Sequence, residues 1–397
     1  MSITEADPLE LLGAARPDEA TLADLVRAVT GDPGAIVLTA RAEPVDYLVG
    51  TPSTAALLRV RGTARRTDGS TTDWSAFVKR LQSPRHWEHL EMIPEAFRAE
   101  FLENLPWRLE IAVHESDVAT HLPDGMRLPD VYLIHDEGDD RATMWMENVA
   151  ESTDPWDLTR FEHAAYLLGR LAAKRQEHLV QPLMPRPGIT TPGIGLRYYV
   201  GGRVTLGTLP ALRDDATWRH PLLDAAVWAN GEHMLRADML ALAQRIPEVL
   251  EALDALPQTY QHGDASPQNL LVPAGEPDTF VVIDWGFDCP QGVGFDLSQL
   301  LIGLGHAGIL DTDQLRAVHG VIVDAFTEGL NADSRLASAE QVRYGYLGAL
   351  MLRSAFNALP LELMGMPPSD EVAELFSRRV RLTRFMVDLT RELPPAL

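Results

Sequence analysis

Three side chains that carry hard oxygen atoms lie close together along the chain: Asp264, Asn269 and Asp284. Asp264 and Asn269 belong to a polar loop that leads into a short apolar strand, and Asp284 ends the apolar run Phe280–Ile283. The turn-forming segment Pro273–Asp278 joins the two strands, so the three side chains are expected to converge at one end of a hairpin. Phosphoryl transfer uses such a set. One carboxylate orients the attacking hydroxyl and accepts its proton, while an amide oxygen and a second carboxylate hold Mg²⁺ on the nucleotide phosphates.

The order of these residues resembles a known family. The tripeptide His-Gly-Asp ends at Asp264, Asn269 follows after four further residues, and Ile-Asp-Trp surrounds Asp284. This pattern is similar to the motifs of the aminoglycoside phosphotransferase and choline kinase-like family, which has a protein-kinase-like fold. The resemblance implies ATP and Mg²⁺ as cofactors, Asp264 as the catalytic base, Asn269 and Asp284 as metal ligands, and Asp296 as a structural brace of the catalytic loop. Ser266 departs from the family, which often has histidine at this position.

The same resemblance implies a lysine that binds the nucleotide phosphates and a helical glutamate that holds it. Lys79 ends the expected strand Trp74–Lys79, and Glu110 lies in the expected helix Trp107–Glu115. The chain contains two lysines, Lys79 and Lys174, among 34 basic residues, so a lysine at this position is informative. An ammonium group can reach a phosphate as a compact point charge, which the planar guanidinium does less well. An ordinary exposed lysine and a solvated helical glutamate remain the alternatives.

Two further segments would complete a nucleotide site. Main-chain groups near Glu147 and Val149 fall where the family has its inter-lobe hinge, and they would bind the adenine edge. Ser53 and Thr54 lie in the segment 50–54, which would cover the phosphates. A plain hairpin turn explains that segment equally well.

The secondary structure expected to position these residues differs between the first and the later part of the chain. The first part is β-rich, and the part after about residue 155 has long stretches with the 3.6-residue apolar periodicity of helices. We therefore predict an α+β, bilobal protein-kinase-like fold with a small antiparallel β-rich N-lobe and a larger, mainly helical C-lobe. The predicted divisions are a nucleotide-binding lobe at 1–146 with 1–20 flexible, a hinge at 147–154, and a catalytic and acceptor-binding lobe at 155–397. Strands are expected at 45–49, 55–61, 74–79, 131–134 and 143–146, helices at 21–31, 107–115, 161–178, 234–256, 311–330, 338–359 and 369–392, and a long loop at 181–203.

The composition of the chain limits the kinds of binding partner that we expect. The net charge of −23 over 397 residues argues against binding nucleic acid through its phosphates or docking on anionic lipid, and it is compatible with a cationic acceptor or simply with solubility. The single cysteine, Cys289, excludes a disulfide within the chain, and we expect it to be buried and inert. No basic and apolar leader and no apolar run of about 20 residues is visible, so we expect a cytoplasmic protein with no membrane partner.

The sequence leaves several functions open. We favour transfer of the γ-phosphate of ATP to a hydroxyl of a small molecule, such as an aminoglycoside-like antibiotic, a sugar or an amino alcohol. The alternatives are a nucleotide-binding pseudokinase with a regulatory role and a Ser/Thr protein kinase-like activity, although the protein-kinase motifs G-x-G-x-x-G, H-R-D and D-F-G are missing. His262 is expected to be a structural histidine. Ordinary packing is the first expectation for aromatic residues that could also line an acceptor pocket: Trp156, Tyr198, Tyr199 and Trp218.

Overall fold

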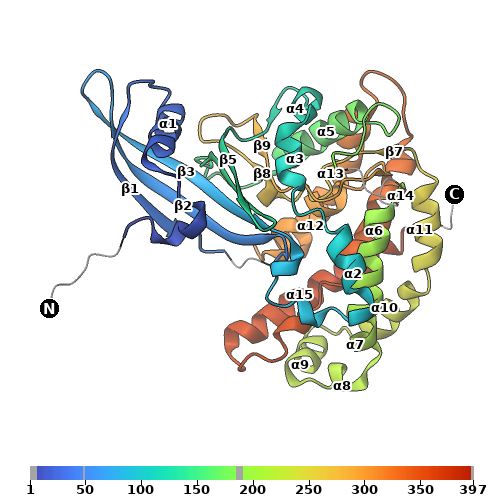
Figure 1. Cartoon of the computed structure of the whole chain (residues 1–397). Coiled ribbons are helices and arrows are strands. Elements are labelled where there is room, and N and C mark those ends of the chain that lie inside the picture. Colours follow the sequence, from blue (N-terminus) through green and yellow to red (C-terminus); the bar gives the residue numbers. More distant parts are fainter. Residues whose placement is uncertain (1–6, 48–49, 185–190, 395–397) are drawn as a thin grey trace. The chain divides into compact units, whose positions relative to one another are not determined.

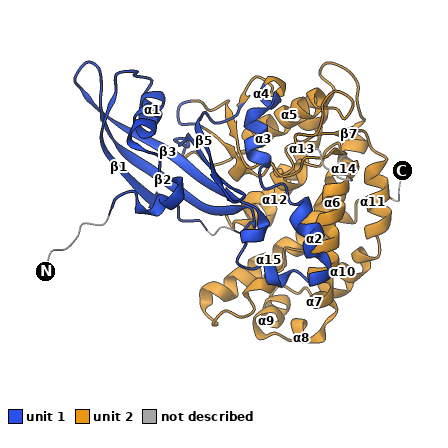
Figure 2. Cartoon of the chain, in the orientation of Figure 1, with its two compact units in different colours: residues 1–119, 127–152, 273–275 blue, residues 120–126, 153–272, 276–397 orange. Residues whose placement is uncertain are grey.

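The computed structural model describes residues 7–47, 50–184 and 191–394. The chain divides into two compact units, which Figure 2 shows in different colours. Unit 1 contains residues 1–119, 127–152 and 273–275, and unit 2 contains residues 120–126, 153–272 and 276–397. The main change of unit falls between Ser152 and Thr153, and the three lobe divisions given above stay a prediction.

Unit 1 is built on a five-stranded antiparallel sheet (Figure 1). The strands lie in the order β1 (Ile36–Pro44), β2 (Thr54–Arg65), β3 (Thr71–Gln82), β6 (Arg141–Glu147) and β5 (Val131–Gly138). The helices of this unit are α1 (Glu19–Thr30), α2 (Glu95–Asn104) and α3 (Leu109–Glu115), and α4 (Val118–His121) and β4 (Met126–Arg127) lie where the chain changes unit.

The two faces of this sheet pack against different elements. Leu25 and Val26 of α1 share a buried cluster with Val78 and Trp145, whereas Ile111 of α3 belongs to a second buried cluster. The second cluster includes Leu81, Met144 and Met146, with Phe77 packed against it. Because successive side chains of a strand point to opposite faces, Lys79 lies on the face of Phe77 and Leu81, which α3 covers.

One expectation for the N-terminal region was wrong, and a second stays a prediction. Residues 1–6 lie outside the described residues, but residues 10–15 form a 3₁₀ helix whose Leu12 is fully buried in the first cluster. The flexibility expected for residues 1–20 stays a prediction. A strand was expected at 45–49, but residues 45–47 are not part of any strand. Residues 48 and 49 lie outside the described part of the chain. The first strand instead lies at Ile36–Pro44, and most of its side chains are exposed or half-buried, so its sequence lacks apolar alternation.

Unit 2 is mainly helical, as expected. Its helices are α5 (Leu158–Lys174), α6 (Ile194–Tyr199), α7 (Leu209–Arg213), α8 (Asp215–Trp218), α9 (Pro221–Ala229), α10 (Leu235–Ala243), α11 (Ile246–Asp254), α12 (Leu297–His306), α13 (Thr312–Leu330), α14 (Ala339–Ala349) and α15 (Asp370–Thr390). Its short strands are β7 (Gln258–Thr259), β8 (Leu270–Leu271), β9 (Phe280–Val282) and β10 (Gln291–Gly292). The predicted α+β organisation is therefore confirmed.

The helices α5 and α13 form the closest helix pair of this unit. A Cβ atom at Gly169 would lie 2.2 Å from the carbonyl oxygen of Phe326, and one at Gly329 would lie 2.0 Å from that of Tyr166. These two glycines let the helix backbones approach one another more closely than any larger residue permits.

Part of the expected loop at 181–203 is helical. Residues 185–190 lie outside the described residues, but α6 is followed directly by the π-helical segment Val200–Thr208. A second π-helical segment, Leu350–Ala355, continues α14, and the two segments contact one another. The many glycines and the absence of a regular apolar stripe hid the first segment in the sequence. Within the described ranges, no helix is long and apolar enough to cross a membrane.

Candidate active site

The backbone of the predicted catalytic loop is held by Asp296. Its two carboxylate oxygens accept the N–H groups of His262, at 2.9 Å, and Gly263, at 2.8 Å, and its side chain is fully buried. Burial raises the pKa of Asp296, and His262 and the two N–H donors oppose that rise. Asp296 immediately precedes α12, so this helix positions the loop, which is the bracing contact that the resemblance implied.

His262 connects the same loop to the end of β9. Its Nδ1 atom accepts the N–H of Asp264 at 3.1 Å, so its Nε2 atom carries the proton and donates to the carbonyl of Ile283 at 2.8 Å. Burial lowers the pKa of His262, which keeps the ring neutral and suits this pairing. Both ring nitrogens are therefore occupied by backbone groups. The expectation of a structural histidine is confirmed.

The structure brings Asp264 and Asn269 into direct contact. The Nδ2 atom of Asn269 donates to the backbone carbonyl of Asp264 at 2.8 Å and lies 3.3 Å from its Oδ2 atom. Because the amide nitrogen faces Asp264, the amide oxygen of Asn269 is turned the other way. The carbonyl of Asn269 accepts the N–H of Ile283 at 3.1 Å, which places Asp284 one residue beyond this contact.

Asp284 has an exposed side chain and a positive φ of 57°. Positive φ is unfavourable for a non-glycine residue and occurs preferentially at functional positions, where the surrounding structure enforces it. The following turn is tightly packed on the catalytic loop, because a Cβ atom at Gly286 would lie 2.8 Å from the carbonyl of Gly263. Any larger residue there would push the loop of Asp264 away from Asp284.

These residues fit a Mg²⁺ ion that nucleotide phosphates help to hold. In the portion of the chain that the structure describes, no group of three or more His, Cys, Asp or Glu could bind a metal by itself. Mg²⁺ commonly takes only one or two protein oxygens and completes its shell with phosphate and water. The amide oxygen of Asn269, which accepts no hydrogen bond within the described ranges, and the exposed carboxylate of Asp284 are donors of that kind.

One residue at this site was missed in the sequence. Arg353, in the π-helical continuation of α14, donates from Nη2 to Oδ1 of Asp264 at 2.8 Å and from Nη1 to the carbonyl of Gly263. Its neighbours Leu350, Met351 and Leu352 are all fully buried. A single arginine within such an apolar run is a signal that could have identified it, since an unpaired buried charge is very costly.

Tyr199 supports this arginine from a second helix. The Tyr199 hydroxyl donates to the carbonyl of Arg353 at 3.1 Å, and the Nδ2 atom of Asn357 also donates to that carbonyl at 3.1 Å. The Asn357 Oδ1 atom accepts from the Thr208 hydroxyl at 2.7 Å. These contacts join the two π-helical segments beside Asp264, and π-helical turns are frequent at functional sites.

The other aromatic residues singled out in the sequence have separate roles. Trp156 packs against Phe161 and Phe280, and the indole N–H of Trp218 donates to the carbonyl of Leu212 at 2.9 Å. Tyr198, next to Tyr199, has an exposed side chain. Tyr199 is therefore connected to Asp264 through Arg353. Cys289 is buried, as expected.

In unit 1, Lys79 and Glu110 form a buried ion pair. The Nζ atom of Lys79 lies 2.5 Å from Oε2 of Glu110, and each side chain is 10% exposed. The long separation between them in sequence is taken up by α2, which the sequence analysis did not anticipate. Register places Lys79 in the middle of the sheet, opposite Leu57 and Met144. The structure therefore places the lysine that is expected to bind phosphate beside the glutamate that is expected to hold it.

Ser53 and Thr54 lie at the start of β2. Thr54 is buried, and the Ser53 hydroxyl lies 2.9 Å from that of Thr51. The carbonyl of Ser53 accepts the N–H of Gln82 at the end of β3 at 2.9 Å. This segment is thereby fixed to the sheet as a turn, and its contact with phosphates stays a prediction.

Glu147 is engaged by Arg127, a residue that the sequence analysis did not single out. Their side chains form two hydrogen bonds, at 2.6 and 2.8 Å, which hold the pKa of Glu147 below its usual range. The N–H of Glu147 donates to the carbonyl of Asp130 at 2.8 Å. That N–H is consequently not available to an adenine ring. Among the described residues, the main-chain groups of Val149 make no backbone hydrogen bond, so Val149 is the better placed of the two predicted adenine contacts.

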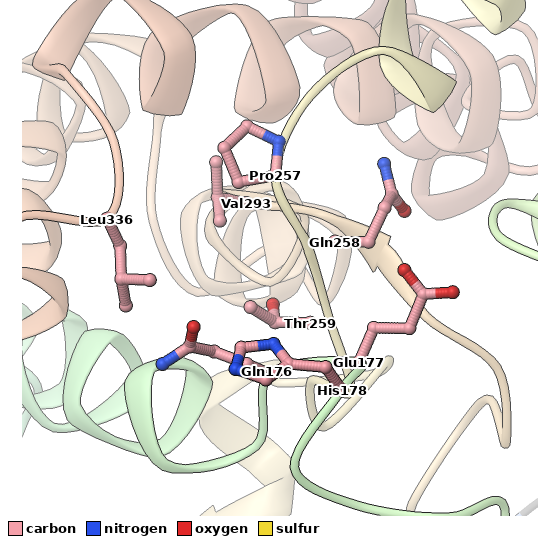
Figure 3. A pocket seen from close by; sticks show the side chains of 8 residues that line it. All are labelled: Gln176, Glu177, His178, Pro257, Gln258, Thr259, Val293 and Leu336. Atoms are coloured by element: carbon pink, nitrogen blue, oxygen red, sulfur yellow. The ribbon is translucent and has the colours of Figure 1, made fainter.

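A pocket of about 460 Å³ lies in unit 2 beside β7 (Figure 3). Its lining comes from the segment after α5, the segment that leads into β7, and two further loops: Gln176, Glu177, His178, Pro257, Gln258, Thr259, Val293 and Leu336. None of the predicted site residues is among these described lining residues. The buried hydroxyl of Thr259 has no hydrogen-bond partner among the groups that the structure describes. The residues that line this pocket therefore differ from those predicted for the active site.

Comparison with protein families identifies the segment that carries this loop. Residues 162–319 match the model of the phosphotransferase enzyme family. The resemblance inferred from the sequence motifs is thus confirmed for this segment, which contains Asp264, Asn269, Asp284 and Asp296. No curated protein sequence matches the chain.

Three solved structures with overall similarity share 17% or less of their sequence with this chain. An aminoglycoside phosphotransferase from Alicyclobacillus acidocaldarius is 14% identical, with 92% of this chain and 96% of that chain covered and a TM-score of 0.46. An amicoumacin kinase in complex with AMP-PNP, Ca²⁺ and its ligand is 13% identical, with coverages of 98% and 97% and a TM-score of 0.46. An aminoglycoside phosphotransferase from Streptomyces rimosus in complex with ADP and streptomycin is 17% identical, with coverages of 85% and 99% and a TM-score of 0.37.

Proposed function

We propose that this protein transfers the γ-phosphate of ATP to a hydroxyl group of a small molecule. The observation that carries the proposal is the contact between Asp264 and Asn269. The carbonyl of Asn269 also bonds to Ile283, the residue before Asp284, and all of these residues lie inside the segment that matches the phosphotransferase enzyme family. A catalytic carboxylate beside a neutral and an anionic oxygen ligand is the arrangement that in-line phosphoryl transfer needs.

Each side chain would have a separate task. Asp264 would accept a hydrogen bond from the acceptor hydroxyl, orient it toward the γ-phosphate and take its proton. Asn269 and Asp284 would hold Mg²⁺, which supplies positive charge to the phosphate oxygens when it is bound. Lys79 would bind the phosphates as a further cation, and Glu110 holds the lysine side chain in one position. The main chain near Val149 would bind the adenine edge.

The acceptor class can be tested directly. Purified protein is incubated with Mg-ATP and a panel of hydroxyl compounds, and ADP release is followed with a coupled enzyme assay. The panel contains streptomycin, kanamycin, spectinomycin, choline, ethanolamine, glucose, glucosamine and casein. We expect ADP release to rise at least tenfold over the acceptor-free rate with one of the small molecules, and mass spectrometry to find that compound heavier by one phosphate.

Other outcomes would overturn the proposal. Labelled phosphate on casein and on none of the small molecules would favour a protein kinase-like activity. Mg-ATP binding measured by calorimetry, with no ADP release above the acceptor-free rate for any compound, would favour a nucleotide-binding pseudokinase.

A further inference from the structure

The guanidinium of Arg353 contacts two consecutive residues of the predicted catalytic loop. One terminal nitrogen donates to the backbone carbonyl of Gly263, and the other donates to Oδ1 of Asp264 at 2.8 Å. A guanidinium is planar and rigid, so two bonds from one group fix both the loop backbone and the rotation of the Asp264 carboxylate. A lysine could not make both contacts with the same geometry.

Arg353 is itself held in place on several sides. Its side chain is 13% exposed and lies over the rings of Phe287 and Phe295, at 5.4 and 5.8 Å from their centroids. Its backbone carbonyl accepts hydrogen bonds from Tyr199 and Asn357. Cation–π contacts and hydrogen bonds of this kind reduce the freedom of the guanidinium before any ligand binds.

The arrangement leaves one oxygen of Asp264 for a ligand. Arg353 occupies Oδ1, whereas Oδ2 has the longer 3.3 Å contact with Asn269, and the Asp264 side chain is 36% exposed. Phosphoryl transfer depends mainly on the position of the reacting groups, because its transition state is loose and needs little proton abstraction.

We propose that Arg353 is a positioning residue that holds Asp264 so that its Oδ2 atom faces the acceptor hydroxyl. This inference rests on the proposed function, and it adds to it a residue outside the segment that matches the family. Arg353 acts through Asp264 rather than on the substrate, so its loss should reduce kcat and leave nucleotide binding unchanged.

The test compares Arg353→Met and Arg353→Lys with a matched control, Arg384→Met. Arg384 is equally buried in the same unit, at 14% exposed, and pairs with Glu232 and Asp238 in place of loop residues. For each protein, kcat and the KM for Mg-ATP are measured with the most rapidly phosphorylated compound of the panel above. Mg-ATP affinity is measured by calorimetry and stability by urea unfolding.

We expect Arg353→Met to lose about a hundredfold in kcat, the size of effect that a misplaced reacting group produces. Its KM and calorimetric affinity for Mg-ATP should stay within about twofold of wild type, and Arg353→Lys should recover at least tenfold of the lost kcat. Arg384→Met should lose stability and keep kcat within about twofold. A wild-type kcat in folded Arg353→Met, or equal losses in the Arg353→Met and Arg384→Met proteins, would overturn the inference alone. A wild-type protein that phosphorylates no compound overturns the proposed function, and this inference with it.

Discussion

Replacing Asp296 by asparagine should damage both the stability of the fold and the rate of catalysis. The Asp296 carboxylate is fully buried and accepts two backbone N–H groups, one on each oxygen. Asparagine keeps one acceptor oxygen and presents an NH₂ group to the other N–H, so one buried donor loses its acceptor. An unsatisfied buried donor costs about 1–3 kcal/mol, and we expect unfolding free energy to fall by about 2 kcal/mol.

The catalytic effect should follow from the residues that those N–H groups belong to. One of them is Gly263, which directly precedes Asp264, so the substitution displaces the predicted catalytic carboxylate. A shift of about 1 Å typically costs on the order of a hundredfold in rate. Urea unfolding gives the stability change, and the coupled ADP assay gives kcat on the same sample.

Asp288 offers a matched control. It is also buried in unit 2 and also accepts two backbone N–H groups, from Leu183 at 2.8 Å and Met184 at 2.6 Å. Asp288→Asn should therefore lose a similar amount of stability and keep kcat within about threefold. The reasoning is refuted if Asp296→Asn unfolds at the wild-type urea concentration, or if both variants lose the same factor in kcat.

Three other predictions concern charges. Lys79→Met should lower the free energy of unfolding by about 3–5 kcal/mol, because it leaves Glu110 buried without the Lys79 cation. The double variant Lys79→Met/Glu110→Leu should unfold at a higher urea concentration than the single variant. A double variant that is no more stable would contradict this. Asp284→Ala should lose Mg²⁺-dependent nucleotide binding in calorimetry, and unchanged affinity would exclude Asp284 as a metal ligand. Burial lowers the pKa of His114, in α3, to about 4, so its contribution to stability is complete above about pH 6.5 and falls as the pH drops toward 4. His114→Gln should therefore make urea unfolding less sensitive to pH between 7.5 and 5, and an unchanged pH dependence would refute it.

Much of the site could be predicted from the sequence because its residues are local. Asp264 and Asn269 share one loop, and the end of an apolar strand carries Asp284, so short-range turn and strand signals place them together. His262 was also correctly expected to be structural, and the family resemblance implied the bracing role of Asp296, which lies 34 residues from His262. Regular helices such as α5 and α13 follow directly from apolar periodicity.

The parts that were missed depend on contacts between distant residues. Arg353 lies ninety residues from Gly263, and nothing in its own neighbourhood shows which loop it faces. The same holds for Arg127 and Glu147, whose pairing is set by the arrangement of the sheet. The edge strand β1 escaped because exposed strands lack the alternation that identifies buried ones, and π-helical turns have no sequence period of their own.

The most direct test of the central claim compares turnover and nucleotide binding in Asp264→Ala. Both quantities are measured on one preparation: kcat with the best acceptor of the panel, and the dissociation constant for Mg-ATP by calorimetry. The account predicts a loss of kcat of about a thousandfold or more, typical for removal of a catalytic acid–base group, with the dissociation constant within about threefold of wild type. A variant that turns over at a rate comparable to wild type would contradict it.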